Sequence, residues 1–137
     1  MTSVGGRAWH ALIRTHHITS RKKVAKLRQA ASAEAVYALI RYGGAPGIMY
    51  CEGDQIGVEN WIASVQIHMK RLRYKDFQLA IKPAEMEPNL NSLFQAKDMI
   101  GLHQAESVKD FANHMKARGV LQWWRKGMGY AEDQDRL

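Results

Sequence analysis

The feature that most constrains the fold of this chain is a tight turn between two strand-like segments. The turn reads GGAPG over residues 43–47, where glycines permit positive φ angles and Pro46 fixes its own φ. Residues 35–42 before the turn and residues 48–52 after it are rich in strand-forming side chains. The pattern predicts that residues 35–52 form a β-hairpin.

A strand pattern and a helix pattern precede this hairpin, and a helix pattern and a strand pattern follow it. The strand patterns alternate apolar and polar residues, whereas the helix patterns repeat apolar residues every three or four positions. The expected segments are residues 7–15 (strand), 20–33 (helix), 55 to 70 or 72 (helix) and 76–82 (strand, ended by Pro83). This order predicts an α+β fold of the ferredoxin-like βαββαβ type, with an antiparallel sheet and both helices on one face.

The remainder of the chain changes character. We expect residues 84–130 to be a helical extension packed on the sheet domain of residues 7–83, and residues 131–137 to be an acidic tail. Within the extension, Ser107 with Asp110 three residues later is a capping-box variant that predicts the start of a helix, and Gly119 predicts its end. We expect three apolar side chains of the extension to be buried against the sheet, namely Phe111, Met115 and at least one of Trp123 and Trp124.

The charge of the chain indicates a polyanionic partner. The formal net charge is +7 and the isoelectric point is near 9.7. Residues 1–33 contain seven Lys or Arg residues and no acidic residue. A second basic cluster at residues 70–75 follows the end of a helix, where positive charge is favourable, so it needs no ligand.

Other features of the composition indicate where the chain works. No apolar stretch approaches the roughly 20 residues that span a membrane, and the first residues lack an apolar signal-peptide core. Cys51 is the only cysteine, which excludes an internal disulfide and favours a reducing compartment. We therefore expect a nuclear or cytoplasmic protein of one domain with an appendage, and no membrane partner.

The start of the first expected helix is a candidate phosphate site. Ser20 is a suitable N-cap, yet the next three residues are basic and stand at the positive end of the helix dipole. A bound anion would make these charges favourable, because helix N–H groups and basic side chains together bind phosphate. Alternatively, the long side chains bend into solvent. The candidate residues are Arg14, His16, His17, Ser20, Arg21, Lys22, Lys23 and Lys26.

A second candidate surface is one face of the sheet. His10, Tyr37, Arg41 and Tyr50 would share a face if the strand registers agree, and aromatic and basic groups together suit single-stranded RNA. The alternative is that the C-terminal helices cover this face and the aromatic side chains are core. No stretch matches the RNP1 pattern of RNA-recognition motifs.

No pattern indicates catalysis, a metal or a cofactor. His16 and His17 are adjacent, so on a strand they would point to opposite faces, and no other histidines or Cys51 have metal-ligand spacing. Nucleotide-binding glycine motifs and nucleophile motifs do not occur. Glu52 and Asp54 could act as paired acids, but a helix N-cap at Asp54 accounts for them more simply. A small acylphosphatase-type enzyme would share only the fold class.

Several short motifs, in order, resemble the C-terminal domain that follows the RWD domain in RWD domain-containing proteins. That domain is similar to the C-terminal domain of the spliceosomal pre-mRNA-processing factor three. The matching motifs are His16-His17-Ile18-x-Ser20-x-Lys22-Lys23, Gly44-x-Pro46-Gly47-Ile48, Glu52-Gly53 and Gly119-x-Leu121-x-Trp123-Trp124.

The resemblance covers about residues 9–128 and implies a ferredoxin-like fold. In the splicing factor it implies contact with small nuclear RNA, both duplex and single strand. Together with the charge pattern, this leads us to expect a non-enzymatic RNA-binding module, linked to small nuclear RNA or RNA processing. The alternative is a protein-interaction module of an RWD-type protein, with a partner bound through the C-terminal helices and no nucleic acid.

Overall fold

The hairpin and its flanking patterns form a sheet with helices on both sides. The structure is a computed structural model that describes residues 8–15, 21–41, 46–69, 77–87 and 99–130. Its elements are β1 (Trp9–Thr15), α1 (Arg21–Ala33), β2 (Tyr37–Arg41), β3 (Gly47–Gly53), α2 (Gln55–Met69), β4 (Phe77–Glu85), β5 (Gly101–Gln104), α3 (Val108–Ala117) and α4 (Leu121–Met128). The class is therefore α+β, as the sequence predicts.

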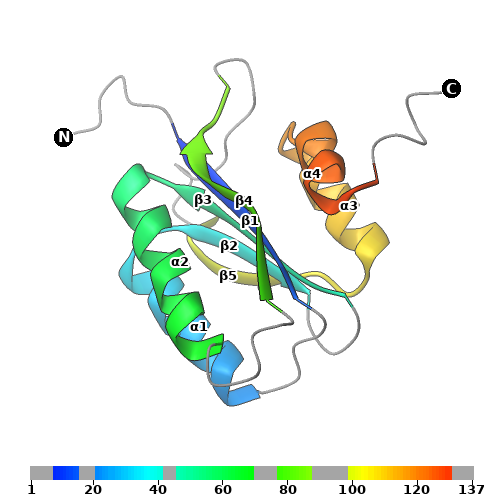
Figure 1. Ribbon diagram of the computed structural model, residues 1–137. Coiled ribbons are helices and arrows are strands. Elements are labelled where there is room, and N and C mark those ends of the chain that lie inside the picture. The colour runs from blue at the N-terminus through cyan, green and yellow to red at the C-terminus, as the bar shows by residue number, and fades with distance from the viewer. Residues whose placement is uncertain (1–7, 16–20, 42–45, 70–76, 88–98, 131–137) are drawn as a thin grey trace, which may run out of the picture.

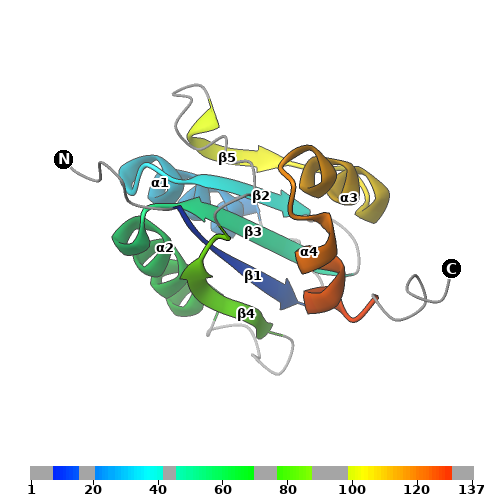
Figure 2. The same ribbon diagram turned by 90° about the horizontal axis from the view of Figure 1, so that it is seen from above.

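The strands make one five-stranded sheet in the order β4-β1-β3-β2-β5, which Figure 2 shows from above. The pairs β4–β1, β1–β3 and β3–β2 are antiparallel, whereas β2 and β5 are parallel. The expected four-stranded, purely antiparallel sheet is therefore wrong in strand count and direction.

Residues 101–104 were expected to belong to a helical extension, and they form β5 instead. Main-chain hydrogen bonds at the two ends of β5 run from Gly101 N to the O atom of Val36, just before β2, at 2.7 Å, and from Ala105 N, just after β5, to Ile40 O at 2.9 Å. Backbone groups along β2 that would otherwise face solvent at the sheet edge gain partners in this way.

Strand β4 also runs further than expected, through Pro83 to Glu85. The register between β1 and β4 shifts near this point, from Leu12 opposite Ile81 to His10 opposite Ala84. Since β4 is an edge strand and proline is tolerated at edges and bulges, the missing N–H does not end the strand.

The sheet is covered on both faces, as Figure 1 shows. Helices α1 and α2 pack on one face, around Trp61 and Leu27, and Trp61 Nε1 donates to Leu27 O at 3.1 Å. Helices α3 and α4 pack on the other face, around Phe111 and Trp124. The sequence left open whether the C-terminal helices cover the second face, and in the structure they do.

Local signals set the ends of α3 as the sequence predicts. The Ser107 side chain accepts from Asp110 N at 3.0 Å, and Asp110 Oδ2 accepts from Glu106 N at 3.0 Å. Arg118 caps the C-terminus, and Gly119 follows with a φ of 81°, a conformation that glycine adopts without strain. The expected burial of Phe111 and Met115 is also confirmed, together with that of Trp124.

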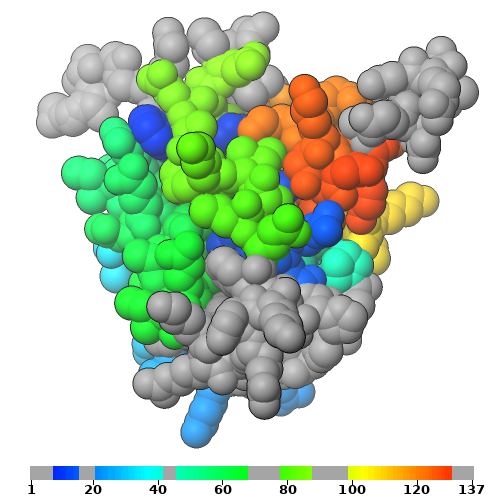
Figure 3. Space-filling view, viewed as in Figure 1, coloured from blue at the N-terminus to red at the C-terminus, as the bar shows by residue number. Residues whose placement is uncertain are grey.

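Helix α4 lies very close to the sheet at Gly127. A Cβ atom at this position would be 2.6 Å from Ile81 Cδ1 and 2.8 Å from Leu12 Cδ2. A side chain at position 127 would therefore require the side chains of Ile81 and Leu12 to shift. Figure 3 shows β4 on the surface between α2 and α4.

Candidate functional site

Helix α1 exposes a basic surface that no acidic residue of the helix offsets. Its exposed basic side chains are Arg21, Lys22, Lys26 and Arg28. Lys22 and Lys26 are four residues apart and therefore lie one above the other on the same side of the helix. Arg28 is partly anchored, since its Nη1 donates to Leu102 O at 3.2 Å. This surface faces away from the sheet and has the charge to attract phosphates.

The other predicted phosphate-site residues have different surroundings. Lys23 is half-buried on α1. Arg14 is half-buried on β1, and its Nη1 donates to Met128 O at 3.0 Å, which joins β1 to the end of α4. His16, His17 and Ser20 lie outside the described residues, so the N-cap contact expected there is not tested.

The residues predicted on the sheet face do share one face, and that face is covered. Tyr37 and Tyr50 are fully buried, His10 is nearly so, and all three belong to the side on which α3 and α4 pack. Arg41 is half-buried, and its Nη1 donates to Pro46 O at 2.7 Å. The hypothesis that these aromatic rings are open to RNA is therefore corrected, because the C-terminal helices occupy the surface that bases would need.

The covered face contains a buried polar network centred on Glu52. Arg118 from the end of α3 places Nε and Nη2 each 2.9 Å from Glu52 Oε1, with only the Nε–H aligned for a hydrogen bond. Tyr50 donates its hydroxyl proton to the same oxygen at 2.9 Å. Glu52 is 0% exposed and Arg118 is 2% exposed, so this ion pair is shielded from water.

The network continues from Tyr50 to His10. The distance from His10 Nδ1 to the Tyr50 hydroxyl oxygen is 3.1 Å. The only proton of the Tyr50 hydroxyl is used in the hydrogen bond to Glu52, so the hydroxyl oxygen can only accept a hydrogen bond from His10. The neutral imidazole of His10 therefore carries its proton on Nδ1. Burial lowers the pKa of His10 to about 4, despite the nearby negative charge of Glu52, so the ring is neutral at physiological pH.

Aromatic rings enclose this network. The Arg118 Cζ atom lies 3.7 Å from the centroid of the Tyr37 ring, a cation–π contact. The indole of Trp123 stacks on His10 with a centroid distance of 3.9 Å and an interplanar angle of 14°. Burial raises the pKa values of Tyr37 and Tyr50 above their ordinary value; the positive charge of Arg118 opposes the rise and the negative charge of Glu52 adds to it. The arrangement holds α3 and α4 on the sheet and leaves the two phenols protonated.

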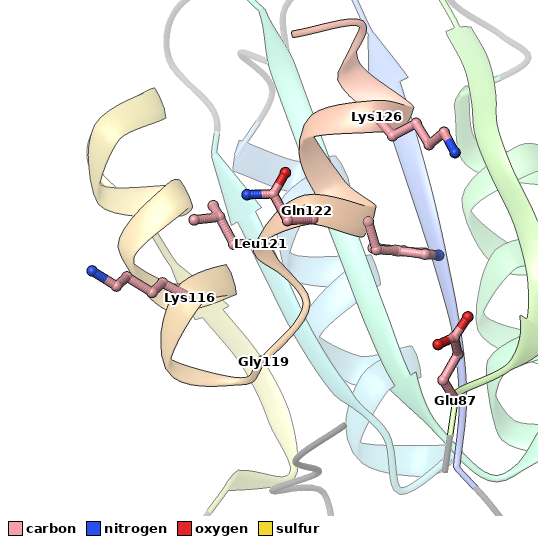
Figure 4. A pocket seen from close by; sticks show the side chains of 7 residues that line it. Glu87, Lys116, Gly119, Leu121, Gln122 and Lys126 are labelled. Carbon is pink, nitrogen blue, oxygen red and sulfur yellow. The ribbon is translucent and has the colours of Figure 1, made fainter. Parts of the chain in front are cut away.

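A cavity of about 560 Å³ opens beside Trp123, between the start of α4 and the chain just after β4. Figure 4 shows Lys116 and Lys126 on opposite sides of Gln122, and Glu87 coming from the end of β4. Trp123 is half-buried, and the other four side chains are exposed. The cavity therefore combines an indole with two cations, an amide and a carboxylate.

Sequence reasoning did not find Arg118. It considered an acid pair of Glu52 and Asp54, preferred an N-cap at Asp54, and gave Glu52 no buried role. A signal was present, since Glu52 follows Tyr50 by two residues and so shares its face of β3. An acid on a strand whose neighbours are apolar needs a buried cation, but nothing in the sequence selects Arg118 among 20 Lys and Arg residues.

Other chemistry is not indicated by the described residues. No group of three or more His, Cys, Asp or Glu side chains among them could hold a metal ion. Burial raises the pKa of the Cys51 thiol well above its ordinary value, and the charge of Glu52 adds to this, which disfavours a thiolate nucleophile. No helix in the described part of the chain is both long enough and apolar enough to cross a membrane.

No protein-family model matches this chain, and no curated protein matches it at a significant level.

Proposed function

We propose that this chain is a non-enzymatic RNA-binding module whose phosphate contacts come from the exposed surface of α1. The observation that supports this most directly is the basic surface itself. Arg21, Lys22 and Lys26 are exposed on a helix without acidic residues, and two of them stand in its first turn. The helix dipole disfavours cations there, so a bound phosphate would relieve an unfavourable arrangement.

Binding of this kind would depend on charge and would discriminate little between RNA base sequences. Each phosphate that a lysine or arginine neutralises releases condensed counterions, so affinity falls as salt rises. Ser20, His16 and His17 are proposed to complete the phosphate site at the start of α1. Protonated histidines would add charge, so affinity should rise as the pH falls through the ordinary histidine value of about 6.5.

We also propose that the first six elements form a ferredoxin-like unit to which β5, α3 and α4 are additions. The support is the partial strand order β4-β1-β3-β2 with its three antiparallel pairs. The resemblance to the C-terminal domain of RWD domain-containing proteins, and to that of the splicing factor, adds an association with RNA processing that these contacts do not test.

The experiment measures binding to a single-stranded RNA of about twenty residues as a function of salt. We compare the wild type with Lys22→Ala/Lys26→Ala. Both lysines are exposed on the surface of α1, so the fold should persist without their side chains. If both contact phosphates, the variant should bind more weakly and lose about 1.4 units from the slope of log affinity against log salt.

The matched control is Lys82→Ala/Lys109→Ala, which removes the same charge from exposed positions on β4 and α3. It should keep the slope of the wild type, because those lysines are distant from α1. Equal slopes for the wild type and the α1 variant would refute the proposed role of α1. Equal losses in both variants would mean that net charge alone attracts the RNA.

A protein-interaction module remains the second candidate, and one observation favours it. Helix α2 exposes Ile56 and Ile67 at 68% and 64% of their surface. They are eleven residues apart, which is three helical turns, and exposed Ala63 lies between them on the same side. The buried apolar side chains of α3 and α4, namely Phe111, Met115, Trp124 and Met128, pack on the sheet instead, so a partner would bind α2.

This candidate is tested with a photo-crosslinking residue in place of Ala63. A protein partner on α2 should give one crosslinked product that Ile56→Ser/Ile67→Ser removes, while RNA binding is undetectable even at low salt. RNA binding that depends on Lys22 and Lys26, without such a product, would exclude the second candidate in favour of the first.

A further inference from the structure

The cavity beside Trp123 lies on the opposite side of the sheet from α1, as Figure 1 shows for the helices that form each surface. Its volume of about 560 Å³ lies within the range of about 300–1,000 Å³ that small-molecule sites occupy. The proposed function makes no use of it. Its lining therefore has to be considered for its own chemistry.

Two aromatic side chains of the sheet fix the indole of Trp123. His10 stacks on it at 3.9 Å, and Tyr50 contacts it edge-on at 5.6 Å and 82°. His10 is in turn bonded to Tyr50, and Tyr50 to Glu52, so the support of the indole is itself fixed. A half-buried ring held in this way can stack with a second ring at little cost in conformational entropy.

The charges around the cavity suit a chain of phosphates more than a single anion. Lys116 and Lys126 are exposed and lie on opposite sides of Gln122 in Figure 4. Two cations on the lining of the cavity, one from α3 and one from α4, can each meet one of the two phosphates that flank a nucleotide within a strand. Lys116, whose ammonium points away from Gln122 in Figure 4, does so by turning its exposed side chain toward the cavity. Gln122 offers both a donor and an acceptor to a base edge, and Glu87 can accept from a ribose hydroxyl or an amino group.

We propose that this cavity binds one base of a single-stranded RNA, stacked on Trp123, with its flanking phosphates at Lys116 and Lys126. An apolar peptide side chain would also fill the volume, but it would make no use of the two lysines. A stacking ring with cations on both sides is the arrangement that single-strand readers use. The ligand class rests on the RNA-binding function proposed above, although the two surfaces share no residue.

The test uses a six-residue oligouridylate and the intact chain. In the wild type, adding the oligonucleotide to about 1 mM should shift the NMR signal of the Trp123 indole N–H. The indole N–H of Trp61 is an internal control, because it is buried and bonded to Leu27 O. The variant Trp123→Phe identifies the Trp123 signal, because that indole N–H signal is missing from its spectrum. No shift of the Trp123 signal would overturn the proposal without the need for any variant.

Variants then give the size of the effect. Trp123→Ala should weaken oligouridylate binding by about fivefold to a hundredfold, the range expected for loss of one stacked base. Lys116→Gln/Lys126→Gln should also weaken it, whereas Lys82→Gln/Lys109→Gln should not. Binding by both cavity variants with the affinity of the wild type would refute the site.

Two further comparisons distinguish base binding in the cavity from RNA binding at α1 and from peptide binding in the cavity. Lys22→Ala/Lys26→Ala should weaken binding of the longer RNA and leave oligouridylate unaffected. If instead only the α1 variant matters for both RNAs, the cavity proposal fails and the proposed function stands. If an acidic peptide, Glu-Asp-Trp-Glu-Asp, shifts the Trp123 signal and oligouridylate does not, the cavity takes a protein segment and our assignment is wrong.

Discussion

Replacing Arg118 by methionine should destabilise the protein strongly, because it leaves the Glu52 carboxylate buried without its cation. The two groups are 2% and 0% exposed, and both nitrogen-to-oxygen distances are 2.9 Å. Removing one partner of a buried ion pair lowers the free energy of unfolding by about 3–5 kcal/mol. The thioether of methionine can still pack on the Tyr37 ring, so the expected loss of stability includes no separate contribution from the lost cation–π contact.

The double variant Glu52→Leu/Arg118→Met separates the cost of burying Glu52 without Arg118 from the value of the ion pair. With both charges gone, an apolar replacement of the pair is itself close to neutral. The hydroxyl of Tyr50 then lacks the acceptor that it has at 2.9 Å, which costs about 1–3 kcal/mol. The double variant should therefore be more stable than Arg118→Met alone.

Urea unfolding followed by tryptophan fluorescence measures these differences. With a slope of about 2 kcal/mol per molar urea, a loss of about 4 kcal/mol moves the midpoint down by about 2 M. Lys109→Met is the control, since it removes one positive charge from an exposed position on the same helix. An Arg118→Met midpoint close to that of the control, or a double variant less stable than the single one, would refute the reasoning.

Two other predictions concern the same face of the sheet. Acidification from pH 6.5 to 4 should lower the free energy of unfolding by up to about 3 kcal/mol through His10, because burial lowers its pKa to about 4 and the unfolded chain then binds the proton more tightly. Urea titrations at each pH should show this loss in the wild type and not in His10→Gln, and equal pH dependence in the two proteins would contradict it. Gly127→Ala should cost up to about 2 kcal/mol net. Its Cβ would displace the side chains of Ile81 and Leu12 at a cost of about 1–3 kcal/mol, against a gain of about 1 kcal/mol from the higher helix propensity of alanine. Its melting temperature should fall below that of the exposed-site control Gln122→Ala, and equal values would show that α4 can move outward freely.

Features set by nearby residues were predictable from the sequence. The N-cap at Asp54, where Oδ1 accepts from Gly57 N at 2.6 Å, depends on residues three positions apart. The same holds for the cap formed by Ser107 and Asp110. Which residues share a face within one strand was predictable too, because side chains alternate along a strand unless a bulge intervenes. Which faces of different strands coincide depends on their register, which the sequence left open.

Features set by pairing between distant segments were not predictable. Strand β5 has four residues, too few for a reliable alternating pattern, and it exists because the edge of β2 offers backbone partners. Pro83 should end a strand in general, but β4 lies at a sheet edge, where a missing N–H costs little. Both corrections follow from the position of the strand in the sheet, which the sequence alone does not state.

The same distinction between local and long-range features applies to the candidate site. Exposure of Lys22 and Lys26 follows from the helical pattern of α1 and was predictable. The cavity required knowledge of where Trp123 and Glu87 meet, and these residues come from segments 36 positions apart. The contact of Trp123 with His10 joins the two ends of the chain, so no local pattern could have indicated it.

The sign of the charge at the centre of the covered face bears on where RNA could bind. If α3 and α4 were to leave the sheet, Arg118 would leave with them, because it belongs to the end of α3. The uncovered face would then present Glu52 beside Tyr37 and Tyr50, with its neutralising cation gone. A carboxylate in the middle of a stacking surface repels phosphates at close range, and the lower dielectric near the sheet strengthens the repulsion. Opening the helices would therefore not create a good RNA surface, which favours contacts at α1 and at the cavity beside Trp123, where exposed lysines outnumber acids.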